Sequence, residues 1–399
     1  MQVINEYLTT PVKYEYDVLV AGGGIAGIAA ALAAARQGVK TALLEKQFML
    51  GGLATAGLIT IYLPLCDGRG TQVSFGIAEE LLRLSILHGY ETEDDYPKPW
   101  LENGTPEEKA ATRFRVQYNP QLFAIEAERL LKKEGVDILY GTSACAITME
   151  DDKITHVIIE NKSGRSGIKV KSVVDATGDA DLCVMAGEET ALFEQKNILA
   201  AWYYHVGKDG YHLKTLGVAD IPDDEKEKEV EKLSQKRFQG IDGAELSKMV
   251  QLSHEALLKD VLNYRKNDPT FFPTTIATIP QVRMTRRIKG CYEMKTSDER
   301  KHFSDSIGMI SNWKKRGPVY EVPFSALHGE KVKNLITAGR CIAAQDSMWD
   351  VTRVIPSCAV TGEAAGIAAA ISENFTRINM LELQKKLKEK GCKLFYDEL

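Results

Sequence analysis

The sequence YDVLVAGGGIAGI occupies residues 16–28 and is the strongest structural signal in the chain. Its first six residues form an apolar run that is typical of a buried parallel strand. Three glycines follow at once, and residues 28–37 are rich in alanine and end before a glycine, as a helix does. Residues 40–45 form a second apolar run that ends on an acid. This order of strand, glycine turn, helix, strand and acid predicts a βαβ unit that binds a dinucleotide.

Each glycine of this motif has its own task in such a unit. Gly22 allows the tight turn, Gly24 lets the backbone approach a pyrophosphate, and Gly27 lets the helix pack closely against the strand. Ile25 and Ala26 lie in the turn before the helix expected at 28–37, where N–H groups and the positive end of the helix dipole stabilise phosphates. We therefore expect these five residues to contact the cofactor.

Glu45 ends the second strand about 20 residues after the glycine turn, where a carboxylate accepts hydrogen bonds from both ribose hydroxyls. The same carboxylate repels a 2′-phosphate, so the sequence disfavours NADP. A glycine motif alone is a weak signal, but here the strand, the helix and the terminal acid are all in place.

Further stretches carry a resemblance to a known family. Glu45-Lys46 is followed by GGLATAG at 51–57, VVDATGDA occupies 173–180, and NLITAGR at 334–340 precedes PSCAVTGEAAG at 356–366. On these residues the chain resembles the glutathione-reductase-type FAD-binding proteins. It is still more similar to the broad family of FAD-dependent oxidoreductases related to the fumarate reductase flavoproteins.

The resemblance implies FAD as the cofactor and gives each stretch a contact with it. The turn at 51–55 follows the pyrophosphate and the ribityl chain, residue 144 contacts the adenine, and residues 176–178 close over the dinucleotide. Gly339 and Arg340 lie at the ribityl or pyrophosphate region, Gly362 begins a helix whose N-terminus points at the flavin, and Arg353 adds a charge. The expected FAD contacts are Gly22, Gly24, Ile25, Ala26, Gly27, Glu45, Lys46, Gly51, Gly52, Leu53, Thr55, Ala144, Ala176, Thr177, Gly178, Gly339, Arg340, Arg353 and Gly362.

The periodicity of the remaining chain predicts an α/β fold. It comprises a Rossmann-like FAD-binding domain, with a parallel sheet and an inserted antiparallel layer, and a second α+β domain for substrate or as a cap. The predicted division is 1–184 for the first part of the FAD-binding domain, 185–330 for the second domain and 331–399 for the C-terminal part of the first. Strands are expected at 136–140, 144–149, 154–160, 168–174, 199–206 and 274–278.

The expected helices surround these strands. Asn119 is placed to cap a helix that covers 122–133, with Pro120 in its first turn. Residues 91–108 are polar, rich in proline and without clear periodicity, which favours a long loop that serves as a lid or a mobile segment. The highly charged stretch 219–268 predicts two or three exposed helices, or a cap over the active site. Further helices are expected at 75–87, 362–370 and 379–390.

The candidate catalytic residues lie mainly in the segment 280–290. Arg283, Arg286 and Arg287 form a cluster of permanent charges that suits a substrate carboxylate or a developing oxyanion. Salt bridges between domains, or contacts with the FAD phosphates, are the alternatives. His205 follows three aromatic residues on an expected strand, where it acts either as a general acid or base or as a structural residue.

Composition narrows the function classes. Fifty basic against fifty-five acidic residues give a net charge of −5, so bulk nucleic-acid binding is not expected. The seven cysteines are widely spaced and form no CxxC pair, which excludes an obvious zinc ribbon, iron–sulfur cluster or redox disulfide. Their number and spacing suggest a reducing, cytoplasmic location. Residues 1–16 are polar, so no secretory signal is expected, and glycines interrupt the most apolar run, so no membrane span is expected.

These observations predict an enzyme, an FAD-dependent oxidoreductase without a metal. We expect hydride transfer between flavin N5 and a small polar substrate that carries a carbonyl or a carboxylate. Two alternatives remain: an RNA-modifying or assembly flavoprotein, and a flavoprotein whose FAD is structural and non-redox. The expected partner is a small-molecule substrate, and a homo-oligomer is left open.

Overall fold

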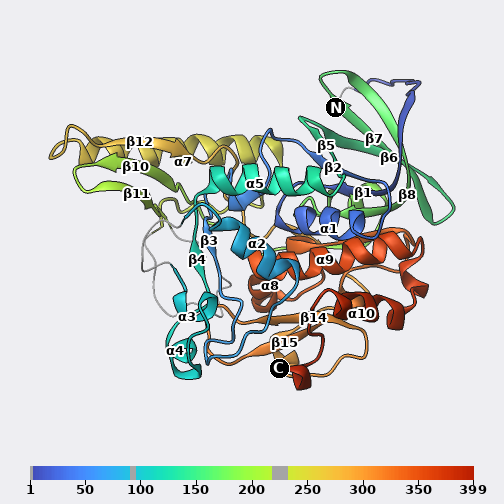
Figure 1. The fold of residues 1–399 in the computed structure, drawn as a ribbon. Helices are drawn as coiled ribbons and strands as arrows, with labels where there is room; N and C mark the ends of the chain where they lie inside the picture. Colours follow the sequence, from blue (N-terminus) through green and yellow to red (C-terminus); the bar gives the residue numbers. More distant parts are fainter. Residues whose placement is uncertain (1–2, 90–95, 218–231) are drawn as a thin grey trace.

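The computed structural model describes residues 3–89, 96–217 and 232–399 (Figure 1). A central sheet lies beside two long helices, α1 (Ile25–Ala35) and α9 (Ile355–Ile371), which pack against each other. An arm built from residues 203–214 and 243–276 extends to the left in Figure 1. Among the described residues, no helix has both the length and the apolar character that crossing a membrane requires.

The central sheet is parallel at its core. β1 (Val12–Ala21) lies between β2 (Thr41–Glu45) and β8 (Gly164–Asp175) and pairs in parallel with both. β5 (Asp137–Tyr140) extends the sheet beside β2, and β16 (Leu335–Thr337) pairs with β8. Every residue of β2 is buried, as expected for a parallel strand covered on both faces. The predicted Rossmann-like α/β architecture is confirmed.

An antiparallel layer continues this sheet on the other side. β6 (Ser143–Glu150) and β7 (Lys153–Asn161) form a hairpin, and β7 pairs with the first part of β8. The turn contains Asp151 in a left-handed conformation with φ of 51°, which aspartate tolerates better than most residues. This is the layer that the sequence predicts before the strand that ends at Asp175.

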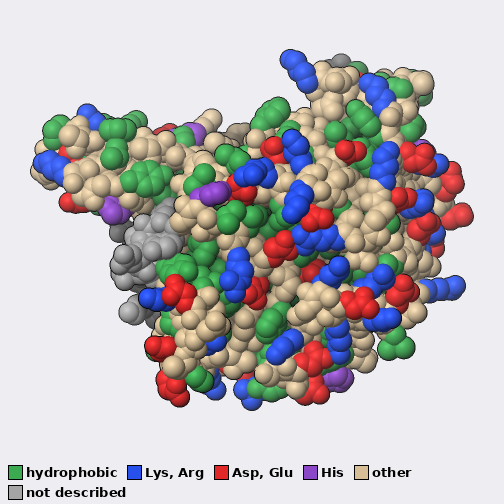
Figure 2. Space-filling view, in the orientation of Figure 1, with side chains coloured by type: hydrophobic (Ala, Val, Ile, Leu, Met, Phe, Trp, Pro, Cys, Tyr) green, Lys and Arg blue, Asp and Glu red, His purple; other side chains and the backbone are tan. Residues whose placement is uncertain are grey.

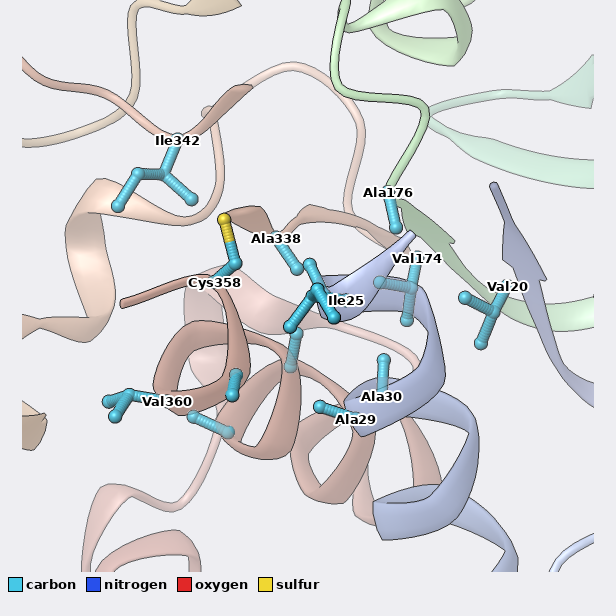
Figure 3. Packing of buried hydrophobic residues seen from close by; sticks show 14 of the residues in the cluster. Val20, Ile25, Ala29, Ala30, Val174, Ala176, Ala338, Ile342, Cys358 and Val360 are labelled. Atoms are coloured by element: carbon cyan, nitrogen blue, oxygen red, sulfur yellow. The ribbon is translucent and has the colours of Figure 1, made fainter. Parts of the chain in front are cut away.

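The contact between α1 and α9 depends on small residues. A Cβ atom added to Gly362 would lie 2.3 Å from the Ala26 carbonyl oxygen, and one added to Gly366 would lie 2.1 Å from the Ala30 carbonyl oxygen. Figure 3 shows the two helices side by side, with Ala29 and Ala30 at the contact. Gly362 was expected to begin the helix, and this was wrong. The helix begins at Ile355, with a proline in its first turn, so that Gly362 lies in its middle and allows α1 to approach.

Other helices follow the predicted pattern with one exception. α5 (Pro120–Lys133) is capped by Asn119, whose Oδ1 accepts hydrogen bonds from the N–H groups of residues 121 and 122. α2 (Ile77–Ser85) and α10 (Met380–Glu389) also lie where helices were expected. The long loop predicted at 91–108 was wrong over its described part, which holds α3 (Lys98–Leu101) and α4 (Pro106–Ala111).

The arm is a small antiparallel sheet covered by one long helix. β10 (Tyr203–Gly207) lies between β11 (Gly210–Lys214) and β12 (Phe272–Ile276), and α7 (Gly243–Tyr264) packs on them through Val261. The exposed helices expected at 219–268 are thus represented by α7, while 218–231 lie outside the described residues.

Residues after the arm return to the main core. The hairpin of β14 (Ser306–Ser311) and β15 (Val319–Pro323) packs against α9 and α10. Ile310 and Val322 belong to the same hydrophobic core as the central sheet. The division at residues 184 and 330 stays a prediction. The remaining elements are β3 (Ile61–Tyr62), β4 (Val116–Gln117), α6 (Asp181–Met185), β9 (Thr190–Leu192), β13 (Arg286–Ile288) and α8 (Asp346–Thr352).

Candidate functional site

A cavity of about 870 Å³ lies at the carboxyl ends of β1, β2 and β8. This is the edge of an open parallel sheet where nucleotide ligands bind. The strand ends contribute Ala21, Glu45 and Ala176 to its walls. Residues far away in the sequence, such as Arg283 and Arg353, line the same space. The cavity therefore joins the predicted dinucleotide unit to the predicted substrate segment.

The glycine turns form one wall of this cavity. Gly22 has a φ of 104°, and a Cβ there would lie 2.4 Å from the Ala176 carbonyl oxygen. Gly24 has no neighbouring atom within 4 Å of a Cβ position, and the Gly51 N–H donates to the Gly23 carbonyl at 2.8 Å. The two glycine turns thus lie against each other and keep side chains out of the space between them.

The start of α1 supplies the anion-binding part of this wall. Ile25 and Ala26 line the cavity, and no side chain caps the helix at Gly24. The N–H groups of a first helical turn and the positive end of the dipole favour a phosphate. Glycines without side chains and a helix start without a capping side chain fit the pyrophosphate of a dinucleotide.

Glu45 stabilises the glycine turn as well as lining the cavity. One carboxylate oxygen accepts a hydrogen bond from the Gly23 N–H at 2.9 Å and the other from the Gln47 N–H at 2.7 Å. The residue is 6% exposed. A carboxylate has further lone pairs, so these contacts leave it able to accept from ribose hydroxyls.

Asp175 fixes the turn that follows β8. Its side chain is fully buried and accepts hydrogen bonds from the Thr177 hydroxyl at 2.7 Å and from the Cys183 N–H at 3.0 Å. Burial raises the pKa of Asp175, while these hydrogen bonds oppose the rise. The backbone of 176–178 is held against the cavity by this carboxylate, a function that the resemblance did not assign.

Three arginines line the cavity, each tied by its own contacts. Arg283 is 2% exposed, and its guanidinium carbon lies 5.3 Å from the centre of the Trp202 ring. Arg340 donates to the carbonyl oxygens of residues 282 and 283 and pairs with Asp179 at 3.4 Å. Arg353 pairs with Asp350, which is fully buried and also pairs with the Lys314 ammonium at 2.5 Å.

The other predicted arginines do not line this cavity. Arg286 pairs with Asp181 at 2.7 Å and donates to the Asp179 carbonyl at 2.8 Å. Arg287 pairs with Glu293 at 2.5 Å, and its guanidinium lies over the Trp349 ring. These contacts favour the salt-bridging alternative for both arginines.

His205 also lies away from the cavity, on β10 of the arm. Its ring stacks on Phe271 with 4.4 Å between ring centres and lies near His212. Burial lowers the pKa of His205, with a smaller contribution from His212. This environment favours the structural alternative for His205.

Most of the predicted FAD contacts come together on the cavity wall. Those that do not line it are Gly27, Thr55, Gly339 and Gly362, which lie directly behind it. Gly27 and Gly339 pack against the Gly22 carbonyl and the Ala26 side chain respectively, so a side chain at either position would displace the wall. The predicted residues that line the cavity are Gly22, Gly24, Ile25, Ala26, Glu45, Lys46, Gly51, Gly52, Leu53, Ala144, Ala176, Thr177, Gly178, Arg340 and Arg353.

The sequence did not identify the residues of the remaining walls, although a cap over the active site was one alternative for 219–268. One is apolar and comes from residues around β3, and another comes from the first half of α7. Neither stretch carries a motif, because residues that enclose a ligand through shape have no fixed spacing. The added lining residues include Ile59, Ile61, Leu63, Leu246, Ser247, Val250, Gln251, Thr278, Ile279 and Val282.

Curated proteins match parts of this chain. Thioredoxin reductase from Ureaplasma parvum is 34% identical over 80 residues, which are 20% of this chain and 26% of that protein. Digeranylgeranylglycerophospholipid reductase from Thermoplasma volcanium is 27% identical over 194 residues, 48% of this chain and 46% of that protein. Thiamine thiazole synthase from Methanococcus vannielii is 30% identical over 172 residues, 41% of this chain and 56% of that protein. The chain thus spans between about a quarter and just over half of the length of these relatives.

Solved structures resemble this one more distantly. A geranylgeranyl bacteriochlorophyll reductase-like protein from Thermoplasma acidophilum aligns over 95% of this chain and 82% of its own length, with 14% identity and a TM-score of 0.43.

The model of the FAD dependent oxidoreductase family matches residues 17–198 and 202–387, nearly the whole chain. The family implies FAD, and the glycine turns and the start of α1, which no side chain caps, fit that cofactor. The chain belongs to the FAD-dependent oxidoreductase family.

Proposed function

We propose that this enzyme oxidises or reduces a small substrate that carries a carboxylate or a carbonyl group, by hydride transfer at a carbon near that group. The bound FAD supplies the hydride acceptor or donor at N5. The observation that carries the proposal is the buried Arg283, which lines the same cavity as the glycine turns and the start of α1.

Arg283 suits the binding of an anionic group. A guanidinium stays charged at all physiological pH values and offers paired N–H donors that match a carboxylate. The neighbouring walls are apolar, with Ile59, Ile61 and Val282, so a bound substrate displaces water and strengthens the attraction. Of the three arginines in the segment 280–290, Arg283 lines the cavity and Arg286 and Arg287 do not, so we assign the substrate contact to Arg283.

Anaerobic reduction of the flavin tests this assignment. The holoenzyme is mixed with a panel of carboxylic and carbonyl compounds, and bleaching of the flavin absorbance identifies those that donate hydride; reoxidation of the reduced enzyme identifies acceptors. For the active compound, we expect Arg283→Gln to lower kcat/KM by about 10- to 100-fold, as for the loss of a charged hydrogen bond. FAD content should stay at the wild-type level.

Arg286→Gln is the matched control, since this residue lies nearby but does not line the cavity. An equal loss of kcat/KM in both variants would contradict the assignment, and so would release of FAD from Arg283→Gln.

Charged side chains of both signs are interspersed on the face shown in Figure 2, so that face offers no basic stripe for an RNA partner.

A further inference from the structure

The segment that carries Arg283 has no strand or helix to hold it. Residues 280–285 lie outside the regular elements and precede β13. Buried backbone groups need hydrogen-bond partners, and outside strands and helices side chains often supply them. Both backbone groups of Arg283 do so. Its N–H donates to Asn197 Oδ1 at 2.8 Å, and its carbonyl accepts from Arg340 Nη1 at 3.1 Å.

Asn197 serves the neighbouring residues as well. Its Oδ1 also accepts from the Met284 N–H at 3.1 Å, while its Nδ2 donates to the Met284 carbonyl at 2.6 Å and to the Phe238 carbonyl at 3.2 Å. The backbone of Asn197 pairs with Phe238 in both directions. The side chain is fully buried and lies outside the cavity lining. One amide therefore joins three segments of the chain at the point where Arg283 enters the cavity.

We infer that Asn197 is a positioning residue for anion binding, because its amide fixes the backbone of Arg283 and so keeps the guanidinium at the cavity. Arg340 fixes the same backbone from the carbonyl side. A charged group binds its ligand tightly where the fold already holds the group in the binding position. A displacement of such a group by about 1 Å lowers activity by up to about 100-fold. The inference rests on the proposed function of Arg283.

Asn334 offers a matched control. It is 1% exposed, its Oδ1 accepts from the Ile154 N–H at 2.8 Å, and its Nδ2 donates to the carbonyls of Ile154 and Lys171, both at 2.8 Å. It precedes β16 and so lies at the end of that strand opposite the cavity. Asn334→Ala thus removes the same kind of buried amide without touching the Arg283 segment.

The experiment measures benzoate binding to the FAD-loaded enzyme through the change in flavin absorbance. We expect Asn197→Ala to weaken benzoate binding by about 10-fold or more, as Arg283→Gln does, while Asn334→Ala binds it as the wild type does. FAD affinity should fall no further in Asn197→Ala than in Asn334→Ala. If Asn197→Ala does not retain FAD, Asn197→Ser, which keeps a hydrogen-bond acceptor on Cβ, takes its place.

Backbone hydrogen exchange gives a second readout. The amides of Arg283 and Met284 should exchange at least about 10-fold faster in Asn197→Ala than in Asn334→Ala. If Arg283→Gln loses benzoate and Asn197→Ala does not, the positioning role is overturned and the proposed function stands. If Arg283→Gln binds benzoate as the wild type does, or if the wild type does not bind benzoate, the positioning role of Asn197 and the proposed function of Arg283 are both overturned. Unchanged exchange at residues 283 and 284 also overturns the positioning role.

Discussion

Glu363 is an ionisable residue that the proposed reaction does not use. It lies in α9, is 3% exposed, and accepts a hydrogen bond from the Ile77 N–H at the start of α2 at 2.8 Å. Burial raises the pKa of Glu363 from 4.5 to about 7, and the hydrogen bond from Ile77 only partly opposes this rise. The folded protein thus holds a proton here that the unfolded chain releases at lower pH.

This raised pKa predicts a pH dependence of stability. Between about pH 4.5 and pH 7 the folded state binds more protons at Glu363 than the unfolded state does, so the free energy of unfolding should fall as the pH rises through this window. Below this window Glu363 is protonated in both the folded and the unfolded state, and above it the loss in the free energy of unfolding is complete. Glu363→Gln should flatten the dependence, which denaturant titrations of the holoenzyme at several pH values measure. An unchanged slope in the variant would assign the dependence to other groups.

Single residues also show how far the sequence could predict the site. Gly22, Gly24 and Glu45 were placed at the cavity because their spacing along one βαβ unit is local. Arg283 could not be separated from Arg286 and Arg287, since the choice depends on Asp181 and Glu293, which lie elsewhere in the chain. Asn197 gave no signal at all, because a buried amide acquires its function only when distant backbone groups come together.

At the scale of elements, the contact of α1 with α9 brings cavity-lining residues of the C-terminal part of the chain next to those of the N-terminal βαβ unit. The contact leaves no room for a side chain at Gly362, where a Cβ would meet the Ala26 carbonyl at 2.3 Å. α9 also carries Cys358 and its first residue Ile355 to the cavity wall. A displacement of α9 therefore alters the shape of the cavity.

We expect Gly362→Ala to lower the free energy of unfolding by about 1–3 kcal/mol through overpacking. It should also weaken FAD binding, because the N-terminus of α9 moves with the helix. Gly243→Ala is the control. It is the first residue of α7, has no atom within 4 Å of a Cβ position, and should change the free energy of unfolding by no more than about 0.5 kcal/mol. Equilibrium unfolding and FAD titration measure both effects, and equal FAD affinity in wild type and Gly362→Ala would contradict the coupling.

The elements were predictable where one periodicity dominated. α5 followed from Asn119, Pro120 and helical spacing, and β6 and β7 from alternation around a turn. The helix α4 was missed although Thr105 and Glu108 form a capping box around it, because the segment has no buried residue to give it a periodic pattern. The start of α9 was missed because the helix is buried on nearly all sides, so that no exposed polar face marks where it begins.

At the scale of the molecule, one cavity lies where the central sheet, the start of α7 and the segment before β13 meet. A ligand that contacts all of them stabilises the folded state by mass action. At a free FAD concentration about 100-fold above Kd the gain is about 2.7 kcal/mol. We therefore expect the melting temperature to rise with the concentration of FAD and to fall when FAD is removed.

The same arrangement predicts where the loss of FAD is felt. In the apoprotein, hydrogen exchange should increase most in residues 240–251 and 278–283, two segments that contribute side chains to the cavity wall but belong to no part of the central sheet. Exchange in β1 and β8 should change least, since both strands are paired on two sides. A uniform increase over the whole chain would instead indicate that FAD stabilises the fold as one cooperative unit.

The close fit of α9 on α1 has a consequence for biosynthesis. Ten consecutive residues of α1, Ile25–Ala34, are buried in the finished protein, yet α9 leaves the ribosome only after most of the chain has been made. At 5–20 residues per second this delay is on the order of tens of seconds, during which an alanine-rich helix has no partner on one side. Translation must therefore pass residue 371 before α9 can cover α1 and complete the cavity wall, so we expect FAD to bind late in the synthesis of the chain.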